Sequence, residues 1–456
     1  MKDWVLRKLS RMHTATLLLL SYLSAIVVGT GLLLLPAACV THQIDFIDAL
    51  FTATSAVCVT GLIVVDTGSF FTPFGQMVIL VLIQLGGLGI MTVTVMLFQV
   101  IGKRVFFQQR MAVQEVFSHT PRADINHLLR SIFVFTAVVE AIGAAFLLFY
   151  WLPHYPLAKA IYLAVFHAIS AFCNAGFSLF ATSFVSDSAS LPLNAIVCIL
   201  IVLGGLGFPV VYELFQRWRT PAKERGRLSV QARAVLLTSA LLIGGGAVIL
   251  FLSEYRPQST TGLGERMLVS IFQSITCRTA GFNTLEMVSL NSASLVLMMF
   301  LMFFGASPGS CGGGVKTTSL AVLSAFSTSR LKRHARVNMF KHSIPADTVS
   351  KCISMLLLSV GLIFTALFLI LLFDPAHGGD IGGRRKFLSY LFEVVSAFGT
   401  VGLSMGITPA LNPFGKAIIV VVMIIGRVGI PVFTYLIAGA TPSKGIEYAE
   451  ENLMIG

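Results

Sequence analysis

The sequence has 456 residues, of which 56% are hydrophobic and only 11% are charged, and its formal net charge is +12. Soluble domains carry about 25% charged residues, so this composition excludes an ordinary soluble protein. The positive charge could also indicate a nucleic-acid-binding surface, but the Lys and Arg residues are spread over alternate connections between apolar stretches. A membrane protein without a nucleic-acid partner is therefore predicted.

Eight apolar stretches follow one another along the chain. A transmembrane helix needs about 20 mostly apolar residues, and each stretch meets this length. The first stretch is too long for the core of a signal peptide and lacks a small-residue cleavage site, so we interpret it as a span. The predicted spans are residues 14–38, 74–101, 130–152, 192–216, 232–253, 292–325, 350–373 and 414–438.

The Lys and Arg residues indicate the orientation of these spans. Most of them lie in the N-terminal segment and in the connections after the second, fourth and sixth spans. Cationic connections remain on the cytoplasmic side, so both termini are predicted to be cytoplasmic. The same basic segments could also contact anionic membrane lipids or an acidic partner. The cluster Arg384, Arg385 and Lys386 is a local exception, because it falls in an outer connection.

A short motif recurs between the two spans of each successive pair. Its four copies read SAVCVTG, SAFCNAG, TCRTAG and SAFGTVG, and they end at Gly61, Gly176, Gly281 and Gly402. About ten helix-compatible residues precede each copy, which is too few to cross a bilayer and predicts a re-entrant half-helix. Irregular backbone is tolerated at membrane depth only inside protein or beside a water-filled cavity. Four such segments therefore predict a shared central pathway.

The predicted fold is an all-α polytopic membrane protein with four tandem helix–pore-half-helix–helix repeats around one central pore. It would contain about eight transmembrane helices and four half-helices. The predicted repeats cover residues 1–110, 111–228, 229–345 and 346–456. Glycines in the second helices, within QLGGLGIM (84–91) and VLGGLGFP (202–209), are interpreted as small residues that permit close helix packing.

The four motifs favour cation coordination by backbone carbonyl groups. A ring of carbonyl oxygens can replace the water shell of an ion, and Gly permits the positive φ angles that turn carbonyls toward one axis. A half-helix that enters from outside also directs the negative end of its dipole toward the membrane centre. Asp45 and Asp48 suit the outer end of the first half-helix and could attract cations there. The predicted potassium-binding residues are Val59, Thr60, Gly61, Asn174, Ala175, Gly176, Thr279, Ala280, Gly281, Thr400, Val401 and Gly402.

The second span of the third repeat contains GASPGSCGGGVKTTS, which cannot form a continuous helix. A break is therefore predicted at residues 305–318, in the inner half of the pathway. An intramembrane Arg is costly unless it is paired or hydrated, and Arg427 lies at a similar depth in the last span. The predicted gate residues are Gly305, Ser307, Pro308, Gly309, Ser310, Gly312, Gly313, Gly314, Lys316 and Arg427.

Other functional classes fit the residues less well. The segment GSCGGGVKTTS superficially suggests a phosphate-binding loop, but Val315 separates the last Gly from Lys316 and no strand precedes it. No paired catalytic set lies in the spans, so the chain is not predicted to be an enzyme or to bind a cofactor. An alternating-access cation symporter with two inverted halves remains the alternative, although the four motif copies run in the same direction.

The four-repeat pattern, TCRTAGFNT and GASPGSCGGGVKTTS together resemble the Trk/Ktr/HKT superfamily of potassium transporters, over essentially the whole chain. Gly at all four motif ends is similar to the potassium-preferring members. The resemblance implies potassium uptake with Na⁺ as an activator or co-ion, and a multi-pass protein of the bacterial inner membrane. It also implies a homodimer and a cytoplasmic KtrA-type regulatory ring that binds ATP or ADP.

The resemblance further places Arg427 just beneath the filter, where it could hydrogen-bond the irregular segment and present a positive barrier to cations. Arg278, in the third motif, is expected to act as a pairing charge behind the filter, with Glu286 or Glu393 as its partner. Glu393 and His167 are expected to support the structure rather than bind the ion.

Overall fold

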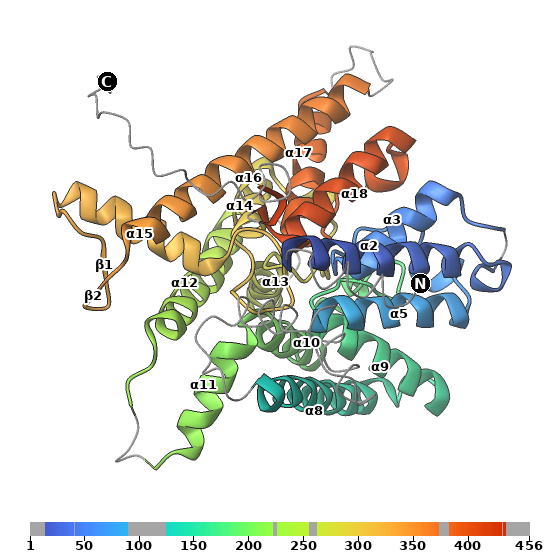
Figure 1. Cartoon of the computed structure of the whole chain (residues 1–456). Coiled ribbons are helices and arrows are strands. Elements are labelled where there is room, and N and C mark those ends of the chain that lie inside the picture. Colours follow the sequence, from blue (N-terminus) through green and yellow to red (C-terminus); the bar gives the residue numbers. More distant parts are fainter. Residues whose placement is uncertain are drawn as a thin grey trace, which may run out of the picture.

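The computed structural model describes residues 14–40, 42–89, 125–221, 226–254, 262–373, 383–430 and 432–434. The basic N-terminal segment, residues 90–101 of the second predicted span, most of the connection after that span and the predicted repeat boundary at residue 110 lie outside these residues. The described chain is almost entirely helical (Figure 1). Its one pair of described strands is the short hairpin of β1 (Asn338–Met339) and β2 (His342–Ser343).

Each repeat consists of a first helix, a half-helix and a second helix. The three helices are α2 (Thr14–Leu33), α3 (Phe46–Val57) and α5 (Pro73–Leu88) in the first repeat; α8 (Ile125–Trp151), α9 (Leu157–Phe172) and α10 (Leu191–Gly205) in the second; α12 (Val230–Ser253), α13 (Leu263–Thr276) and α14 (Ser292–Phe303) in the third; and α16 (Ala346–Phe373), α17 (Gly383–Gly399) and α18 (Pro413–Val428) in the fourth.

Additional elements connect these helices. Short connecting helices are η1 (Pro36–Ala38), α4 (Thr67–Phe70), η2 (Val185–Asp187), η4 (Met287–Ser289) and η5 (Thr408–Ala410). Two longer ones, α11 (Phe208–Arg219) and α15 (Thr317–Leu331), follow the second helices of the second and third repeats.

The first helices carry the membrane-facing surface. Within the described residues, the four helices that are individually long and apolar enough to cross a bilayer belong to α2, α8, α12 and α16. They expose large apolar side chains, because Val27, Phe149, Leu241 and Phe364 are each at least 60% exposed. Such surface is stable only against an apolar solvent, so these helices face the lipid.

Local sequence signals set the start of the second helices. Thr72 and Asn412 accept hydrogen bonds from the N–H groups three residues later, at 3.3 and 2.6 Å, and a Pro occupies the first helical position after each. Asn291 caps α14 in the same way at 2.8 Å. These residues satisfy N–H groups that have no partner inside the helix, which explains why the chain turns back into the membrane at these points.

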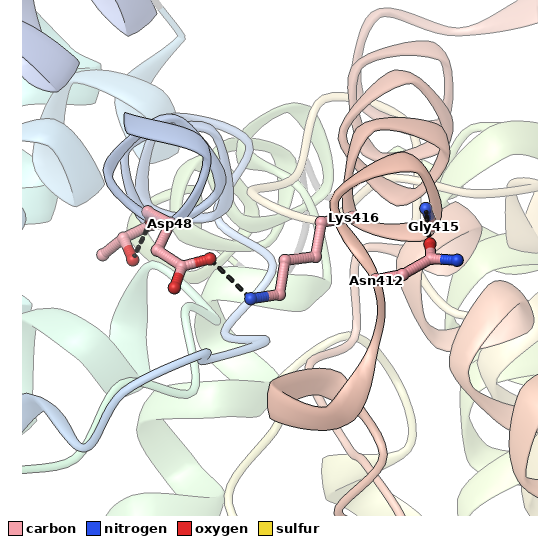
Figure 2. Close-up of polar contacts among 5 residues, drawn as sticks. Asp48, Asn412, Gly415 and Lys416 are labelled. Carbon is pink, nitrogen blue, oxygen red and sulfur yellow. Dashed lines mark hydrogen bonds and ion pairs between the residues drawn. The ribbon is translucent and has the colours of Figure 1, made fainter. Parts of the chain in front are cut away.

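The four repeats close into a ring. Each half-helix packs against the second helix of the preceding repeat, in the pairs α5 with α9, α10 with α13, α14 with α17 and α18 with α3. At the seam between the fourth and first repeats, Lys416 Nζ lies 2.6 Å from an Asp48 carboxylate oxygen (Figure 2). Both side chains are at most 16% exposed. The sequence position of Asp48 predicts that it attracts cations at the outer end of the half-helix. In the structure, its charge is instead neutralised by Lys416.

The second helices are shorter than the spans predicted for them. Helices α5, α10 and α18 end just before Gly89, Gly207 and Gly429, whose φ angles are +82°, +86° and +94°. The span predicted at 192–216 is therefore wrong as one continuous helix, because α11 turns by 101° from α10. The spans predicted at 74–101 and 414–438 extend beyond the ends of α5 and α18, and their residues 90–101 and 435–438 lie outside the described residues. Glycine adopts these positive φ angles without the clash that a Cβ atom would cause, so it can end a helix sharply.

The packing role predicted for Gly86 and Gly204 agrees with the structure, and Gly426 packs in the same way, whereas Gly89, for which packing was also predicted, ends its helix. A Cβ atom on Gly86, Gly204 or Gly426 would lie closer than 3.0 Å to the carbonyl oxygen of Val57, Phe172 or Phe398, at the end of a half-helix. Each Gly-x-x-Gly segment thus combines close contact at its first glycine with helix termination at its last. In the third repeat, α14 ends at Phe303 and α15 begins at Thr317, so that helix is interrupted where the sequence predicts a break.

Candidate functional site

The four motif loops have the same backbone conformation. The residue two before each motif glycine has a positive φ angle: +56° at Val59, +59° at Asn174, +72° at Thr279 and +50° at Thr400. Such angles are uncommon for residues other than Gly, so their recurrence in all four repeats indicates a shared structural requirement. The motif glycines follow with φ angles of +90° at Gly61, +69° at Gly176, +81° at Gly281 and +92° at Gly402.

The four loops meet in a closed ring of glycines and carbonyl groups. A Cβ atom on each motif glycine would lie closer than 3.0 Å to the carbonyl oxygen that precedes the motif glycine of the next repeat. The last glycine, Gly402, meets the carbonyl oxygen of Thr60 and so closes the ring. The four carbonyl groups are those of Thr60, Ala175, Ala280 and Val401. The structure thus brings together the residues predicted for the filter. The four motif glycines have no space for a side chain.

Hydroxyl groups fasten each loop to its half-helix. Ser55 and Ser396 accept hydrogen bonds from the N–H groups of Gly61 and Gly402, both at 3.1 Å. In the other two repeats, Ser170 and Thr276 donate to the carbonyl group that follows the glycine, at 2.7 and 2.6 Å. The sequence alone predicts no role for these residues. The Ser that opens three of the four motif copies was the available signal.

The second repeat has additional polar support. Asn174, with its amide oxygen 3.3 Å from the Thr279 hydroxyl, directs its amide nitrogen to the carbonyl groups of Ala171 and Ile201. His167 is fully buried, and its Nδ1 lies 2.8 Å from the Leu163 carbonyl oxygen. With Nδ1 donating to that oxygen, Nε2 can accept from the Ser178 hydroxyl and the Leu179 N–H. Both ring nitrogens have partners, which agrees with the supporting role predicted for His167.

The charged residues near the motifs have partners different from those predicted. Arg278 donates to the Gly305 carbonyl oxygen at 3.2 Å and to the Ser239 hydroxyl at 2.8 Å. The pairing of Arg278 with Glu286 or Glu393 is therefore wrong, because the fold places a carbonyl and a hydroxyl group at the guanidinium. Glu393 instead accepts hydrogen bonds from Ser404, at 2.8 Å, and from Thr408, which supports its structural interpretation.

An irregular segment of residues 304–316, here called the inner loop, lies against the motif loops. Cβ atoms on Gly305 and Gly312 would collide with the Thr279 side chain. The Gly313 N–H donates to the Thr400 hydroxyl at 2.8 Å. The inner loop therefore contacts the third and fourth motif loops directly, and its glycines leave no space between them.

Hydrogen bonds connect the inner loop to the second repeat. Ser307 and Cys311 donate their N–H groups to the carbonyl oxygens of Gly205 and Gly204, at 3.3 and 3.2 Å. The Gly309 carbonyl oxygen accepts from the N–H of Phe208 at 3.0 Å, and the carbonyl oxygen of Pro308 lies against Gly207. Within the loop, the Ser310 hydroxyl donates to the Ser307 carbonyl group at 2.7 Å. These bonds use backbone groups that the interrupted helices leave without internal partners.

Two cations hold the other side of the inner loop. The Arg427 guanidinium donates to the carbonyl oxygens of Cys311 in the loop and Gly86 in α5. The Lys316 ammonium donates to the Gly312 carbonyl oxygen at 2.7 Å, and the Gly314 N–H donates to Gly426 at 3.1 Å. Arg427 therefore links the first repeat, the inner loop and the fourth repeat, while the loop itself is hydrogen-bonded to the second, third and fourth repeats.

A family model described as TrkH, cation transport protein, matches residues 8–447. The chain belongs to the TrkH family of cation transport proteins. The membership in the Trk/Ktr/HKT superfamily that the sequence predicts is thereby confirmed, and the family is one of transport proteins rather than enzymes.

Relatives of this TrkH-family chain match it over nearly its whole length. It is 36% identical to the Ktr system potassium uptake protein B of Vibrio alginolyticus, over 96% of this chain and 94% of that protein. It is 35% identical to the protein of the same name from Bacillus subtilis, with coverages of 100% and 99%. The potassium/sodium uptake protein NtpJ of Enterococcus hirae is 36% identical, with coverages of 98% and 98%.

A solved structure confirms the all-α fold of the TrkH-family chain. The potassium transporter TrkH from Vibrio parahaemolyticus superposes with a TM-score of 0.72 at 20% identity, over 94% of this chain and 85% of that chain.

In the present structure, a cavity of about 310 Å³ borders the inner loop, with Arg427, Lys316, Cys311 and Tyr22 among its lining residues. One side of the inner loop thus faces open space while the other side is packed under the motif loops.

Proposed function

We propose that the chain takes up potassium ions across the bacterial inner membrane through a filter formed by the four motif loops. The ring in which the carbonyl groups of Thr60, Ala175, Ala280 and Val401 alternate with the motif glycines carries this proposal. Backbone oxygens at this density can replace the hydration shell of a K⁺ ion. Relatives named as potassium uptake proteins support K⁺ as the transported ion.

The electrical potential can drive this uptake without an energy source on the chain itself. One charge that crosses 100 mV gains about 2.3 kcal/mol. Each half-helix directs the negative end of its dipole at the ring, which stabilises a cation between outer water and the inner half of the membrane. The cyclic arrangement of four like units favours a channel-like pathway over the two inverted halves of an alternating-access symporter.

We propose that the inner loop and Arg427 form the gate. Loop residues Gly305 to Gly314 lie directly against the filter residues Thr279 and Thr400, so an ion leaving the filter meets this segment. The Arg427 guanidinium, bound to the loop, adds a positive charge that opposes the passage of a cation. The Lys316 ammonium, bound to Gly312, strengthens the same barrier. Opening then requires the loop to exchange its bonds and move into the bordering cavity.

The remaining parts of the proposal concern partners and co-ions. We infer a homodimer, N- and C-termini in the cytoplasm, and control by a KtrA-type ring that binds ATP or ADP. Two relatives named as components of a Ktr system support a system with more than one component. Na⁺ is proposed as an activator or co-ion, which is consistent with one relative named as a potassium/sodium uptake protein.

Rubidium uptake into vesicles that contain the purified chain tests the function and the gate together. Wild-type protein should accumulate Rb⁺ when a negative internal potential is imposed, in competition with K⁺. Arg427→Ala should raise the maximal rate severalfold with little change in the apparent K⁺ affinity, because the filter residues are unchanged. Lys332→Ala, which removes an exposed lysine at the end of α15, is the charge-matched control and should leave the rate unaltered.

The two proposals fail in different ways in this assay. Absence of potential-driven uptake by folded wild-type protein would refute the potassium pathway. Uptake by the wild type with no acceleration in a correctly folded Arg427→Ala protein would leave the filter intact and refute the gate.

A further inference from the structure

Helix α11 combines basic and aromatic residues on an exposed surface. It leaves α10 at an angle of 101°, so the chain runs across the direction of the second helix instead of continuing along it. Near its end, Phe215 is 45% exposed and Trp218 is 75% exposed. The Arg219 guanidinium lies 4.5 Å from the centre of the Phe215 ring, and the rings of Phe215 and Trp218 are 6.4 Å apart.

Contacts with the start of α12 place this surface at the membrane boundary. The Glu213 carboxylate accepts hydrogen bonds from the Ser229 N–H and hydroxyl, at 2.6 and 2.7 Å, and Ser229 caps α12. Because α12 is a membrane-crossing helix, the residues that precede it lie at the interface. Arg217 donates to the Gly226 carbonyl oxygen at 2.7 Å, which fixes α11 to the same connection. Positive charge in this connection indicates the cytoplasmic side.

The chemistry of this surface fits one class of partner. Tryptophan and phenylalanine beside arginine are typical of the boundary between headgroups and acyl chains, where the rings enter the apolar layer and the guanidinium meets phosphate. The carboxylate of Glu213, on the same helix, has both oxygens engaged by Ser229. An anionic phospholipid therefore complements the surface in both charge and polarity.

The opposite end of α11 is bonded to the inner loop. The Phe208 N–H, in the first turn, donates to the Gly309 carbonyl oxygen at 3.0 Å. Gly207, immediately before the helix, lies against the carbonyl oxygen of Pro308 with no space for a Cβ atom. A ligand bound at the C-terminal end of α11 would therefore restrain a helix whose N-terminal end is hydrogen-bonded to the inner loop.

We propose that Phe215, Trp218 and Arg219 form a binding site for an anionic phospholipid of the cytoplasmic leaflet, and that this lipid restrains the inner loop through α11. The lipid site itself is independent of the proposed function, whereas the effect on the loop rests on it. Each arginine near a membrane surface is expected to enrich an anionic lipid about fivefold.

Quenching of tryptophan fluorescence by brominated lipids tests the binding site directly. The signal of Trp218 is obtained as the difference between wild-type protein and Trp218→Phe in phosphatidylcholine vesicles. A small fraction of brominated phosphatidylglycerol should quench this signal about fivefold more effectively than the same fraction of brominated phosphatidylcholine. Arg219→Gln should abolish the preference, whereas Lys332→Gln should retain it.

Each alternative result has a definite meaning. Equal quenching by the two lipids would refute an anionic site. No quenching by either would show that the surface lies outside the bilayer and would favour a protein occupant instead.

The restraint is tested by Rb⁺ uptake in vesicles that contain phosphatidylglycerol. Arg219→Gln should transport at least twofold faster than wild type in these vesicles and at the wild-type rate in phosphatidylcholine alone. Equal rates in both compositions would refute the effect on the loop. Because fluorescence quenching does not require transport, its result stands even if the proposed potassium pathway is refuted.

Discussion

Replacement of Gly402 by alanine is the most direct test of the carbonyl ring. The φ angle of Gly402 is +92°, and a residue with a Cβ atom pays roughly 1–2 kcal/mol for a left-handed conformation. The added atom would also lie 2.9 Å from the Gly61 Cα and closer still to the Thr60 carbonyl oxygen. Overpacking of this kind costs about 1–3 kcal/mol. If the ring expands to relieve about 2 kcal/mol of this strain, K⁺ affinity should fall roughly 30-fold.

The structure also predicts an order among the four glycines. Gly176 has the smallest φ angle, +69°, and its Cβ atom would lie 2.8 Å from the Ala280 carbonyl oxygen, the longest of the four distances. Gly176→Ala should therefore be milder than Gly402→Ala. Gly406 is a matched control, because its φ angle is +82° but no atom lies within 4 Å of its Cβ position. Gly406→Ala introduces the backbone strain without the collision, and it should leave K⁺ affinity unchanged.

The assay is the concentration dependence of Rb⁺ uptake with K⁺ as competitor, with thermal unfolding recorded for each variant. The expected result is a large loss of affinity for Gly402→Ala, a smaller one for Gly176→Ala and none for Gly406→Ala. An affinity within twofold of wild type in folded Gly402→Ala would refute the ring. Equal damage from Gly406→Ala would show that the effect comes from general backbone strain.

Two further predictions concern contacts that hold the ring. Asp48→Asn leaves the partly buried Lys416 without its carboxylate, so it should reduce the free energy of unfolding by about 1–3 kcal/mol and lower the thermal unfolding temperature. The double variant with Lys416→Met should lose less stability than the sum of the two single variants. Simple additivity would contradict a direct interaction. Ser396→Ala removes the acceptor of the Gly402 N–H and should weaken K⁺ affinity about fivefold, since such a hydrogen bond contributes about 1 kcal/mol. Ser359→Ala is the control, because it removes a buried hydroxyl that is hydrogen-bonded within α16, and it should keep wild-type affinity.

The repeat architecture could be predicted because its signals are local. Each motif keeps its glycine, its half-helix and its flanking spans in the same order, and the positive φ angles at Gly61 and Gly402 follow from that residue type. The ends of the second helices could not be predicted in this way. Gly86 and Gly89 are only three residues apart, and both are small residues in an apolar stretch. The first packs against Val57 and the second ends the helix, a difference that depends on what the fold places beside each.

The partners of the charged residues could not be predicted from local sequence patterns either. Arg278 bonds to Gly305 and Ser239, which are 27 and 39 residues away, and Lys416 bonds to Asp48 across 368 residues. Opposite charge alone favours Glu286 or Glu393 as the partner of Arg278, whereas the fold supplies neutral oxygens. The placement of Arg427 beneath the filter came from family resemblance, because no periodicity in the sequence identifies its two carbonyl partners.

The described structure contains one inner loop and four similar motif loops, and the inner loop packs against the third and fourth of them. In a channel assembled from four identical subunits, such an element would occur four times, and partial opening could produce conductance sublevels. Here the segment between α14 and α15 is bonded directly to three repeats of one ring and is linked to the first repeat through Arg427, so its release is a single event. A recording from one pore is therefore expected to show two current levels. Any cooperativity in activation would then have to arise between separate chains.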